Sequence, residues 1–398
     1  MRRLLLVTHR SIEQEGGPAA RWRAFARHLP EHGWEVDVVS AADGLGASEF
    51  DVHRARAVSA RATVMARVAA AAEPVFGLAG VRPDALPLSM LWVPRGARLV
   101  GRRYREWQPE VVLATGPPMA GPLAARLGLP DAARTIVEFR DLWAGSPAFD
   151  AGGRVMPAVE SWLLRGAQRI VACTPEAVAD LRRRHSALAD RVVEVPNGFD
   201  PTVWEAAGGE ARGESRDRRL TLLHSGTLTP ARPLTPLLRA LVDPRVEGSF
   251  RLVLHGYLSP ASRAEVEQTR TESNVPVEVV APSSWEEAVR RIASADGGLI
   301  TQAHEAGDAT AVASKVYEYL ALGKPVLCVT DGGATEALLR RLDAAELCAR
   351  LDDPEGIVQS LIRLRDTSLP PVSRDLLERY NRRALAARMA DLLDDVAR

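Results

Sequence analysis

Residues 313–327 read Ala-Ser-Lys-Val-Tyr-Glu-Tyr-Leu-Ala-Leu-Gly-Lys-Pro-Val-Leu. Serine often caps helices, and Ser314 stands directly before a stretch with helical periodicity. Glycine and proline end that stretch, and residues 325–329 form a short apolar run typical of a buried strand. The segment predicts a helix that passes directly into a strand, which is the repeating unit of an α/β sheet.

The same alternation extends along the whole chain. A first set of short apolar runs comprises residues 4–8, 36–40, 111–115, 135–139, 170–174 and 192–195. A second set comprises residues 220–224, 251–255, 277–280, 298–301 and 325–329. Helical stretches separate the runs, so we expect two doubly wound, Rossmann-like parallel sheets covered by helices on both faces.

A boundary between two domains is expected after the sequence Pro196-Asn197-Gly198. Residues 200–219 are rich in Gly, Glu, Arg and Asp, which is typical of an exposed loop beside a domain boundary. We predict an N-terminal domain of residues 1–199 and a C-terminal domain of residues 200–373, facing an interdomain cleft. The last helical stretch, residues 374–398, is expected to pack back onto the N-terminal domain.

Composition excludes several classes of protein. The 398 residues contain 46% apolar residues and equal numbers of basic and acidic residues, 51 of each, so we expect no nucleic-acid partner. Cys173, Cys328 and Cys348 lack the spacing of metal ligands and lie in apolar runs. The apolar run at residues 4–7 is too short for a signal peptide or a membrane span, so a cytoplasmic protein is expected.

Glycine-containing turns follow the first strand of each predicted domain. Gly16 and Gly17 precede a helix at about residues 20–28, either as an ordinary turn or to let the backbone approach a phosphate. Gly226 and Thr227 follow the strand at 220–224, and Arg232 comes next, as a diphosphate ligand or a solvated surface residue. Neither turn has a GxGxxG or P-loop motif, which argues against a dehydrogenase or a P-loop enzyme.

The helix after Ser314 combines the groups that a nucleoside diphosphate requires. Amides of its first turn, including that of Val316, and the ammonium of Lys315 suit phosphates. Glu318 lies on the next turn, where its carboxylate can accept hydrogen bonds from ribose hydroxyls.

The order and spacing of these motifs resemble a family-4 glycosyltransferase of the GT-B fold, in the branch typical of bacterial polysaccharide and glycoconjugate assembly. The resemblance covers nearly the whole chain. It rests on Gly16-Gly17-Pro18, Gly33-Trp34-Glu35-Val36, Thr115-Gly116-Pro117-Pro118, Glu138-Phe139-Arg140-Asp141-Leu142-Trp143, Pro196-Asn197-Gly198-Phe199-Asp200, Gly226-Thr227-Leu228 with Arg232, and residues 314–327.

The resemblance implies retention of anomeric configuration, a nucleotide-sugar donor on the C-terminal domain and an acceptor on the N-terminal domain. It implies no required metal and no cofactor besides the donor. Arg232 and Lys315 match positions expected to stabilise the leaving diphosphate, and Glu318 matches the second acid of the family's Glu-x7-Glu motif. Gly17 matches the glycine expected to approach the donor phosphates.

One departure from the family pattern concerns the first acid of that motif. Thr310 stands at its position, and Glu305 and Asp308 lie nearby but out of register. The family's first acid often contacts the transferred sugar, so His304 is either a partial replacement or an exposed loop histidine.

Three residues of the N-terminal domain are candidates for acceptor contacts. Asp141 follows a strand at its carboxyl end, where it can orient an acceptor hydroxyl. Arg140 beside it can bind an acceptor phosphate or pair with an acid, and His9 either faces the cleft or makes a structural hydrogen bond. Retaining transfer needs no strong enzymatic base, because the departing diphosphate can take the acceptor proton.

A locally basic segment suggests a further partner. Arg95, Arg98, Arg102, Arg103 and Arg105 lie between Trp92 and Trp107. One interpretation is that they make a peripheral contact with the anionic inner face of the cell membrane or bind a lipid diphosphate acceptor. The other is that they form the solvated face of an ordinary helix.

The sequence therefore predicts a hexosyl-type transfer from a nucleoside-diphosphate sugar to a glycan, lipid-linked or small-molecule hydroxyl. Two alternatives remain at this point. One is a sugar-nucleotide epimerase or hydrolase of the same fold, and the other is a catalytically silent nucleotide-sugar-binding partner subunit, which Thr310 makes conceivable.

Overall fold

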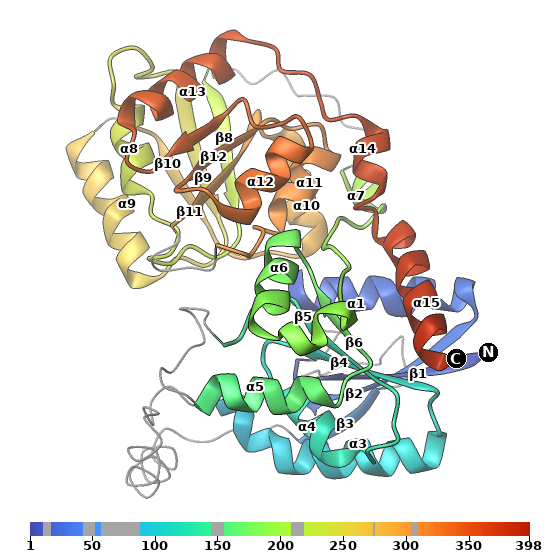
Figure 1. Cartoon of the computed structure of the whole chain (residues 1–398). Helices are drawn as coiled ribbons and strands as arrows, with labels where there is room; N and C mark the ends of the chain where they lie inside the picture. Colours follow the sequence, from blue (N-terminus) through green and yellow to red (C-terminus); the bar gives the residue numbers. More distant parts are fainter. Residues whose placement is uncertain are drawn as a thin grey trace, which may run out of the picture. The chain divides into compact units, whose positions relative to one another are not determined.

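The computed structural model describes residues 1–10, 17–42, 52–56, 88–144, 155–207, 219–273, 275–303 and 309–398. These residues form two compact units (Figure 1). Unit 1 contains residues 1–197 and 383–398, and unit 2 contains residues 198–382. The chain thus changes unit after Asn197 and again after Arg382.

Unit 1 is built on a parallel sheet of seven strands in the order β3-β2-β1-β4-β5-β6-β7. The strands are β1 (Arg2–Thr8), β2 (Trp34–Ala42), β3 (Val52–Arg56), β4 (Val111–Gly116), β5 (Thr135–Phe139), β6 (Arg169–Ala172) and β7 (Val192–Glu194). Its helices are α1 (Gly17–His28), α3 (Val93–Trp107), α4 (Ala120–Gly128), α5 (Val155–Arg165), α6 (Pro175–Arg184) and α15 (Arg382–Ala397). The strand order reverses its direction between β1 and β4, which is the topological switch point of the unit.

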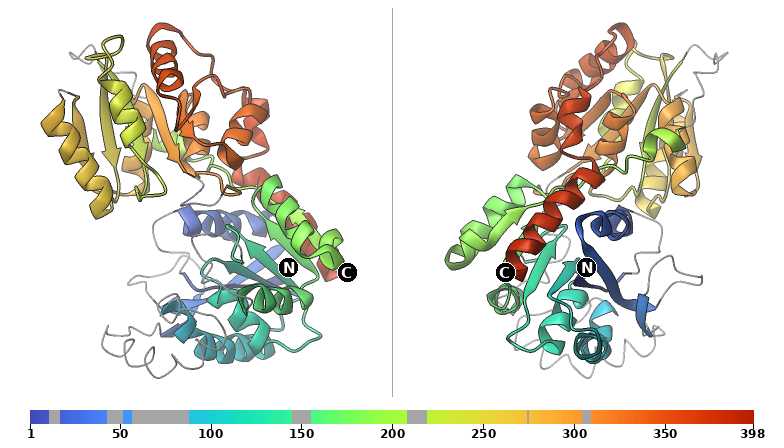
Figure 2. Two further views of the ribbon diagram at one scale, coloured as in Figure 1. Left: turned by 60° about the vertical axis from the view of Figure 1, so that its left-hand side comes forward. Right: turned by 90° about the vertical axis from the view of Figure 1, so that its right-hand side faces the viewer.

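Helix α15 is an integral part of unit 1, although it comes last in the sequence. Leu385, Met389 and Leu393 are spaced one helical turn apart and are buried against the sheet face that α1 also covers (Figure 2). Asp394 accepts a hydrogen bond from Trp34 Nε1 at 2.8 Å and forms an ion pair with Arg2 at 2.6 Å. The two ends of the chain therefore lie close together.

Unit 2 contains a parallel sheet of six strands in the order β10-β9-β8-β11-β12-β13. The strands are β8 (Leu220–Ser225), β9 (Phe250–His255), β10 (Val277–Val280), β11 (Gly297–Gln302), β12 (Val326–Thr330) and β13 (Cys348–Arg350). The helices are α7 (Val203–Ala206), α8 (Thr235–Leu241), α9 (Pro260–Glu272), α10 (Trp285–Ser294), α11 (Lys315–Ala321), α12 (Gly333–Arg341), α13 (Pro354–Asp366) and α14 (Arg374–Glu378). Its switch point lies between β8 and β11.

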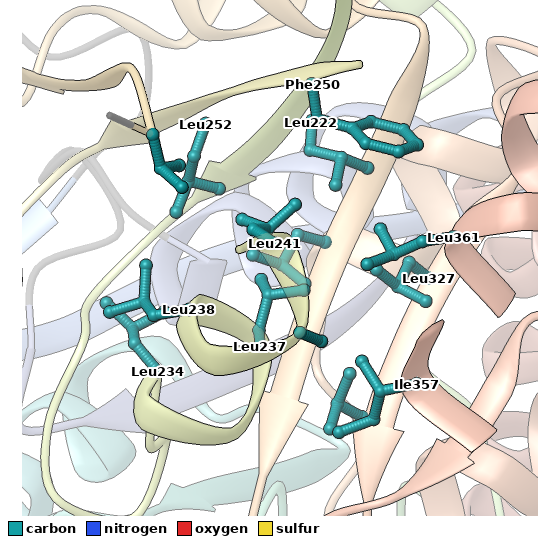
Figure 3. Close-up of a cluster of buried hydrophobic side chains, with 14 of the residues drawn as sticks. Leu222, Leu234, Leu237, Leu238, Leu241, Phe250, Leu252, Leu327, Ile357 and Leu361 are labelled. Carbon is teal, nitrogen blue, oxygen red and sulfur yellow. The ribbon is translucent and has the colours of Figure 1, made fainter. Parts of the chain in front are cut away.

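Two apolar cores hold the helices of unit 2 to the two faces of its sheet. Helices α8 and α13 supply Leu237 and Leu361 to a leucine-rich cluster against Leu222, Leu252 and Leu327 of the strands (Figure 3). Helices α10, α11 and α12 contribute to a second cluster on the opposite face. Each unit is therefore an α/β sandwich in its own right, which confirms the predicted Rossmann-like class.

The predicted strands are all present, and β3 and β13 are two further strands that were not predicted. The stretch 374–398, expected to be one helical element, is divided into α14 and α15. Among the described residues, no helix is both long enough and apolar enough to cross a membrane.

Candidate functional site

The switch point of unit 2 brings the predicted donor residues to one edge of the sheet. β8 and β11 pair only through Leu222 with Gly297 and Leu223 with Gly298. Beyond these residues both strands run on to Ser225 and Gln302. Doubly wound sheets bind their ligands at the carboxyl edge beside such a switch point.

The turn that follows β8 requires glycine. Gly226 has a φ of 144°, which L-residues rarely adopt, and its amide donates to the His255 carbonyl at 2.9 Å. A Cβ atom on Gly256 would lie 2.1 Å from the Gly226 carbonyl oxygen. The turns after β8 and β9 therefore pack backbone against backbone.

Arg232 is held beside this turn. Its Nη1 donates to the carbonyl of the exposed Thr227 at 2.5 Å, and its own amide donates to the Thr229 carbonyl at 2.8 Å. The neighbouring Ala231 carbonyl accepts a 2.9 Å hydrogen bond from Ala303, which directly follows β11. The loop that carries Arg232 is thereby joined to the carboxyl end of β11.

Lys315 and Glu318 lie together on α11. Lys315 Nζ is 2.7 Å from Glu318 Oε2, and the two side chains are 24% and 9% exposed. Trp285, the first residue of α10, donates from Nε1 to Glu318 Oε1 at 3.2 Å. Trp285 was not among the predicted site residues, although it begins a helix that follows β10 at this same edge.

The first turn of α11 differs from the expectation in two details. Ser314 occupies the N-cap position and is exposed, but its side chain makes no capping hydrogen bond. Val316 is buried in the core, and its amide donates to the Ala313 carbonyl at 3.0 Å. The Val316 side chain is therefore a packing residue and does not face a ligand.

The segment before α11 is attached to β11 and α12. Gln302 Nε2 donates to the Ala311 carbonyl at 3.2 Å, and Thr335 Oγ1 donates to Gln302 Oε1 at 2.8 Å. Thr335 Oγ1 also accepts from the Ala313 amide at 3.1 Å. Thr310 lies in this anchored segment, whereas His304, Glu305 and Asp308 lie outside the described residues.

Two buried histidines at the same edge are held neutral. Burial, reinforced by the nearby charge of Arg232, lowers the pKa of His224 to about 4. Burial also lowers the pKa of His255, and Arg291 and Lys315 add to that effect. The positive charge at this edge therefore comes from arginine and lysine side chains, Arg232 and Lys315 among them, and not from the histidines.

The predicted acceptor residues lie at the carboxyl edge of the unit 1 sheet. His9 follows β1, and its ring packs edge-on against Trp92 with centroids 5.6 Å apart. Arg140 and Asp141 follow β5, and Asp141 is half-buried. Gly17 is the first residue of α1, whereas Gly16 lies outside the described residues.

Arg140 is 9% exposed, and its Nη2 donates to the Pro117 carbonyl. Burial lowers the pKa of its guanidinium, and the carboxylates of Glu138 and Asp141 act against that shift. This environment indicates a largely internal role for the Arg140 side chain.

Glu138 is the centre of a buried network that the sequence analysis did not identify. Its carboxylate accepts from Arg21 Nη2 at 3.0 Å, Trp22 Nε1 at 2.6 Å and Thr115 Oγ1 at 2.6 Å. Burial raises the pKa of Glu138, but Arg21 and the hydrogen bonds from Thr115 and Trp22 outweigh it, so the net pKa is lowered.

Arg21 extends the network to the last residues of unit 1 before the chain enters unit 2. It donates to the carbonyls of Pro196 at 2.5 Å and Val195 at 2.9 Å. The network therefore ties α1, which begins at Gly17, to the carboxyl ends of β4 and β5.

Comparisons with known proteins agree with this geometry. Residues 16–198 match the family model described as a glycosyl transferase 4-like domain. A search of curated proteins found no significant match.

Solved structures match the whole chain. Burkholderia multivorans α,α-trehalose 6-phosphate synthase is 15% identical, with a TM-score of 0.70 over 100% of this chain and 99% of that one. Anabaena HepE in complex with UDP-glucose is 15% identical, with a TM-score of 0.68 over 99% of this chain and 100% of that one. A Rickettsia africae glycosyltransferase is 11% identical, with a TM-score of 0.69 over 99% and 98% of the two chains. At these identities the likeness establishes the fold. The chain has the two-domain GT-B fold of these solved structures, and its residues 16–198 match a glycosyl transferase 4-like domain.

Proposed function

We propose that this protein transfers a hexosyl group, with retention and without a metal, from a nucleoside-diphosphate sugar to a hydroxyl of a glycan, lipid-linked or small-molecule acceptor. One observation carries the proposal. Arg232 lies on the loop after β8, and Lys315 is the first residue of α11, which follows the adjacent strand β11 at the same edge of the sheet. The Ala303 to Ala231 hydrogen bond joins these two loops.

The two cations suit a leaving diphosphate. Cleavage of the bond between the sugar and the diphosphate leaves additional negative charge on the phosphate oxygens. Fixed positive groups stabilise that charge in the transition state because they need no reorganisation when it develops. Arg232 is fixed by Thr227, and Lys315 is fixed by Glu318.

Glu318 suits the ribose of the donor. Its carboxylate already accepts from Lys315 and Trp285, which orient it. A carboxylate has about four lone-pair positions, so it can accept further hydrogen bonds from vicinal hydroxyls. The Anabaena neighbour was solved with UDP-glucose, which makes UDP-sugars the first donors to test.

Metal independence is proposed from the charges at this edge. Arg232 and Lys315 supply the positive charge that a divalent ion provides at other diphosphate sites. Among the described residues, no three His, Cys, Asp or Glu side chains gather as a metal site.

The acceptor is proposed to bind unit 1 near Asp141. Its half-buried carboxylate at the carboxyl end of β5 is suited to orienting a hydroxyl, and the departing diphosphate can take the proton. His9 lies at the same edge and belongs to the proposed acceptor region, whereas the buried Arg140 next to Asp141 supports that region from inside the unit. A Burkholderia xenovorans neighbour was solved with glucose-6-phosphate, which supports a carbohydrate acceptor among those to test.

Peripheral contact with an anionic membrane is the second part of the proposal. Arg95, Arg98, Arg102 and Arg105 are spaced three, four and three residues apart, so they form one exposed stripe along α3. Trp92 of the predicted patch does not take part, because it is 1% exposed, whereas Trp107 is half-buried. Arg103 is bound to Asp37 and lies over the Trp107 ring.

Nucleotide binding tests the donor site. The protein is screened by thermal shift against UDP, GDP, ADP, dTDP and CDP and their sugars, with and without EDTA. We expect a base-selective shift that EDTA does not change and that Lys315→Ala abolishes. No shift with any nucleotide would favour the silent partner, and consumption of donor without acceptor would favour a hydrolase or epimerase.

A further inference from the structure

The carboxyl ends of β8 and β11 leave backbone groups that the sheet does not pair. β8 and β11 stop pairing after Leu223 and Gly298. Tyr319 of α11 inserts its hydroxyl here: it donates to the Leu223 carbonyl at 2.9 Å and accepts from the Ser225 amide at 2.9 Å. One phenol thus takes the place of a missing neighbour strand.

His224 does the same for β11. Its Nδ1 lies 3.2 Å from the Leu299 carbonyl, and this ring is also buried. Beyond Leu223 and Gly298, backbone groups of β8 and β11 therefore bond to the side chains of Tyr319 and His224 and not to each other.

The position of the Tyr319 ring depends on glycine at the facing position. A Cβ atom on Gly298 would lie 2.5 Å from ring carbons of Tyr319. Tyr319 itself is fully buried, so the ring has no alternative place in solvent. Gly298 and Tyr319 therefore form a matched pair.

This contact connects the two halves of the donor site. Tyr319 is adjacent to Glu318 and one turn from Lys315 on α11. Ser225 directly precedes the Gly226 turn, whose next residue, Thr227, binds Arg232. The hydrogen bond between the Ser225 amide and the Tyr319 hydroxyl thus connects α11, which carries Lys315, to the turn that binds Arg232.

We propose that Tyr319 is a positioning residue that aligns Arg232 with Lys315 on the two phosphates of the donor. This inference rests on the donor site proposed above. Tyr319 touches no substrate and acts through the backbone of Ser225. A small misplacement of groups that act on one transition state has large effects on rate, of the order of 100-fold for about 1 Å.

Tyr319→Phe tests the inference because it removes the hydroxyl and keeps the ring. Tyr317→Phe is the matched control: it lies two residues away on α11, and its ring packs on Tyr380 at 5.3 Å. Affinities are measured by calorimetry for UDP, GDP and ADP and the corresponding monophosphates. We expect Tyr319→Phe to weaken diphosphate binding roughly tenfold and monophosphate binding much less, with kcat falling more than KM changes.

A purely structural role would weaken both nucleotides equally or lower only the melting temperature. Equal affinities and rates in wild type and Tyr319→Phe, while Lys315→Ala loses binding, would overturn the inference and leave the donor site standing. If the wild type binds no nucleotide, the donor site fails and the inference fails with it. Hydrogen exchange separately checks the contact itself: the Ser225 amide should exchange faster in Tyr319→Phe than in Tyr317→Phe, and equal exchange would refute the coupling.

Discussion

Lys315 Nζ and Glu318 Oε2 lie 2.7 Å apart on consecutive turns of α11, and the Glu318 carboxylate also holds Trp285. The cation and the anion proposed for the donor therefore orient each other before any ligand arrives. Both side chains are largely enclosed. Removing one partner therefore leaves the charge of the other partly buried and uncompensated.

Replacement of Lys315 should lower catalytic activity and leave the fold intact. Lys315→Ala removes a charge proposed to act on the leaving diphosphate, so we expect kcat/KM to fall roughly 100-fold or more. Lys315→Arg keeps the charge and should restore part of the activity. Steady-state kinetics with the donor found by thermal shift checks this, and wild-type kinetics in Lys315→Ala would contradict the site assignment.

Trp285 is predicted to affect donor affinity through Glu318. Trp285→Phe removes the Nε1–H donor and leaves an aromatic ring at the start of α10. Loss of this hydrogen bond leaves the Glu318 carboxylate less firmly oriented toward the ribose, so we expect donor affinity to fall roughly tenfold. Calorimetry measures it, with Trp204→Phe as the control because Trp204 donates to the Ala321 carbonyl at the other end of α11. Equal losses in the two variants would argue against a specific role for Trp285.

Much of the fold was predictable because buried parallel strands form continuous apolar runs. β3 escaped prediction because its sequence, Val-His-Arg-Ala-Arg, carries three polar residues as an edge strand does. β13 has three residues, too few for a recognisable pattern.

The candidate site was predictable only in part. Charged residues such as Arg232 and Lys315 can be recognised in the sequence because they follow predicted strands. A buried tyrosine cannot be distinguished from an ordinary core residue. The role of Tyr319 depends on where β8 and β11 stop pairing, and the sequence does not reveal that point. Val316 was expected to contribute its backbone amide to the donor site, and the burial of its side chain in the core, which helical periodicity explains, leaves that expectation untested.

Glu138 should make stability depend on pH. Its folded-state pKa lies below the ordinary value of 4.5, so folding favours the ionised form. The contribution to the free energy of unfolding is complete above the unfolded-state pKa and is lost as the pH falls through the folded-state pKa. Glu138→Gln leaves the buried Arg21 without its counter-charge and should cost about 3 kcal/mol or more at pH 7.

Urea unfolding of the wild type and Glu138→Gln between pH 7 and pH 3 measures this contribution. The stability difference between the two proteins should shrink as the pH falls. Glu278→Gln, at an exposed position of β10, is the control and should show no such trend. A difference that stays constant with pH would show that the lost packing, not the charge, matters.

The arginine stripe on α3 should bind anionic vesicles through charge alone. Trp92 is buried, and the half-buried Trp107 ring is covered by Arg3 and Arg103, so we expect little aromatic insertion from this segment. Each arginine near an anionic surface contributes about 1 kcal/mol, and salt screens the interaction. We expect flotation with phosphatidylglycerol vesicles at low salt, loss of flotation at high salt, and none with phosphatidylcholine.

Arg98→Glu with Arg102→Glu should abolish flotation, whereas Arg263→Glu on the exposed side of α9 should not. Flotation that survives the double charge reversal would place the membrane contact elsewhere, and no flotation of the wild type would identify the stripe as a solvated helix face.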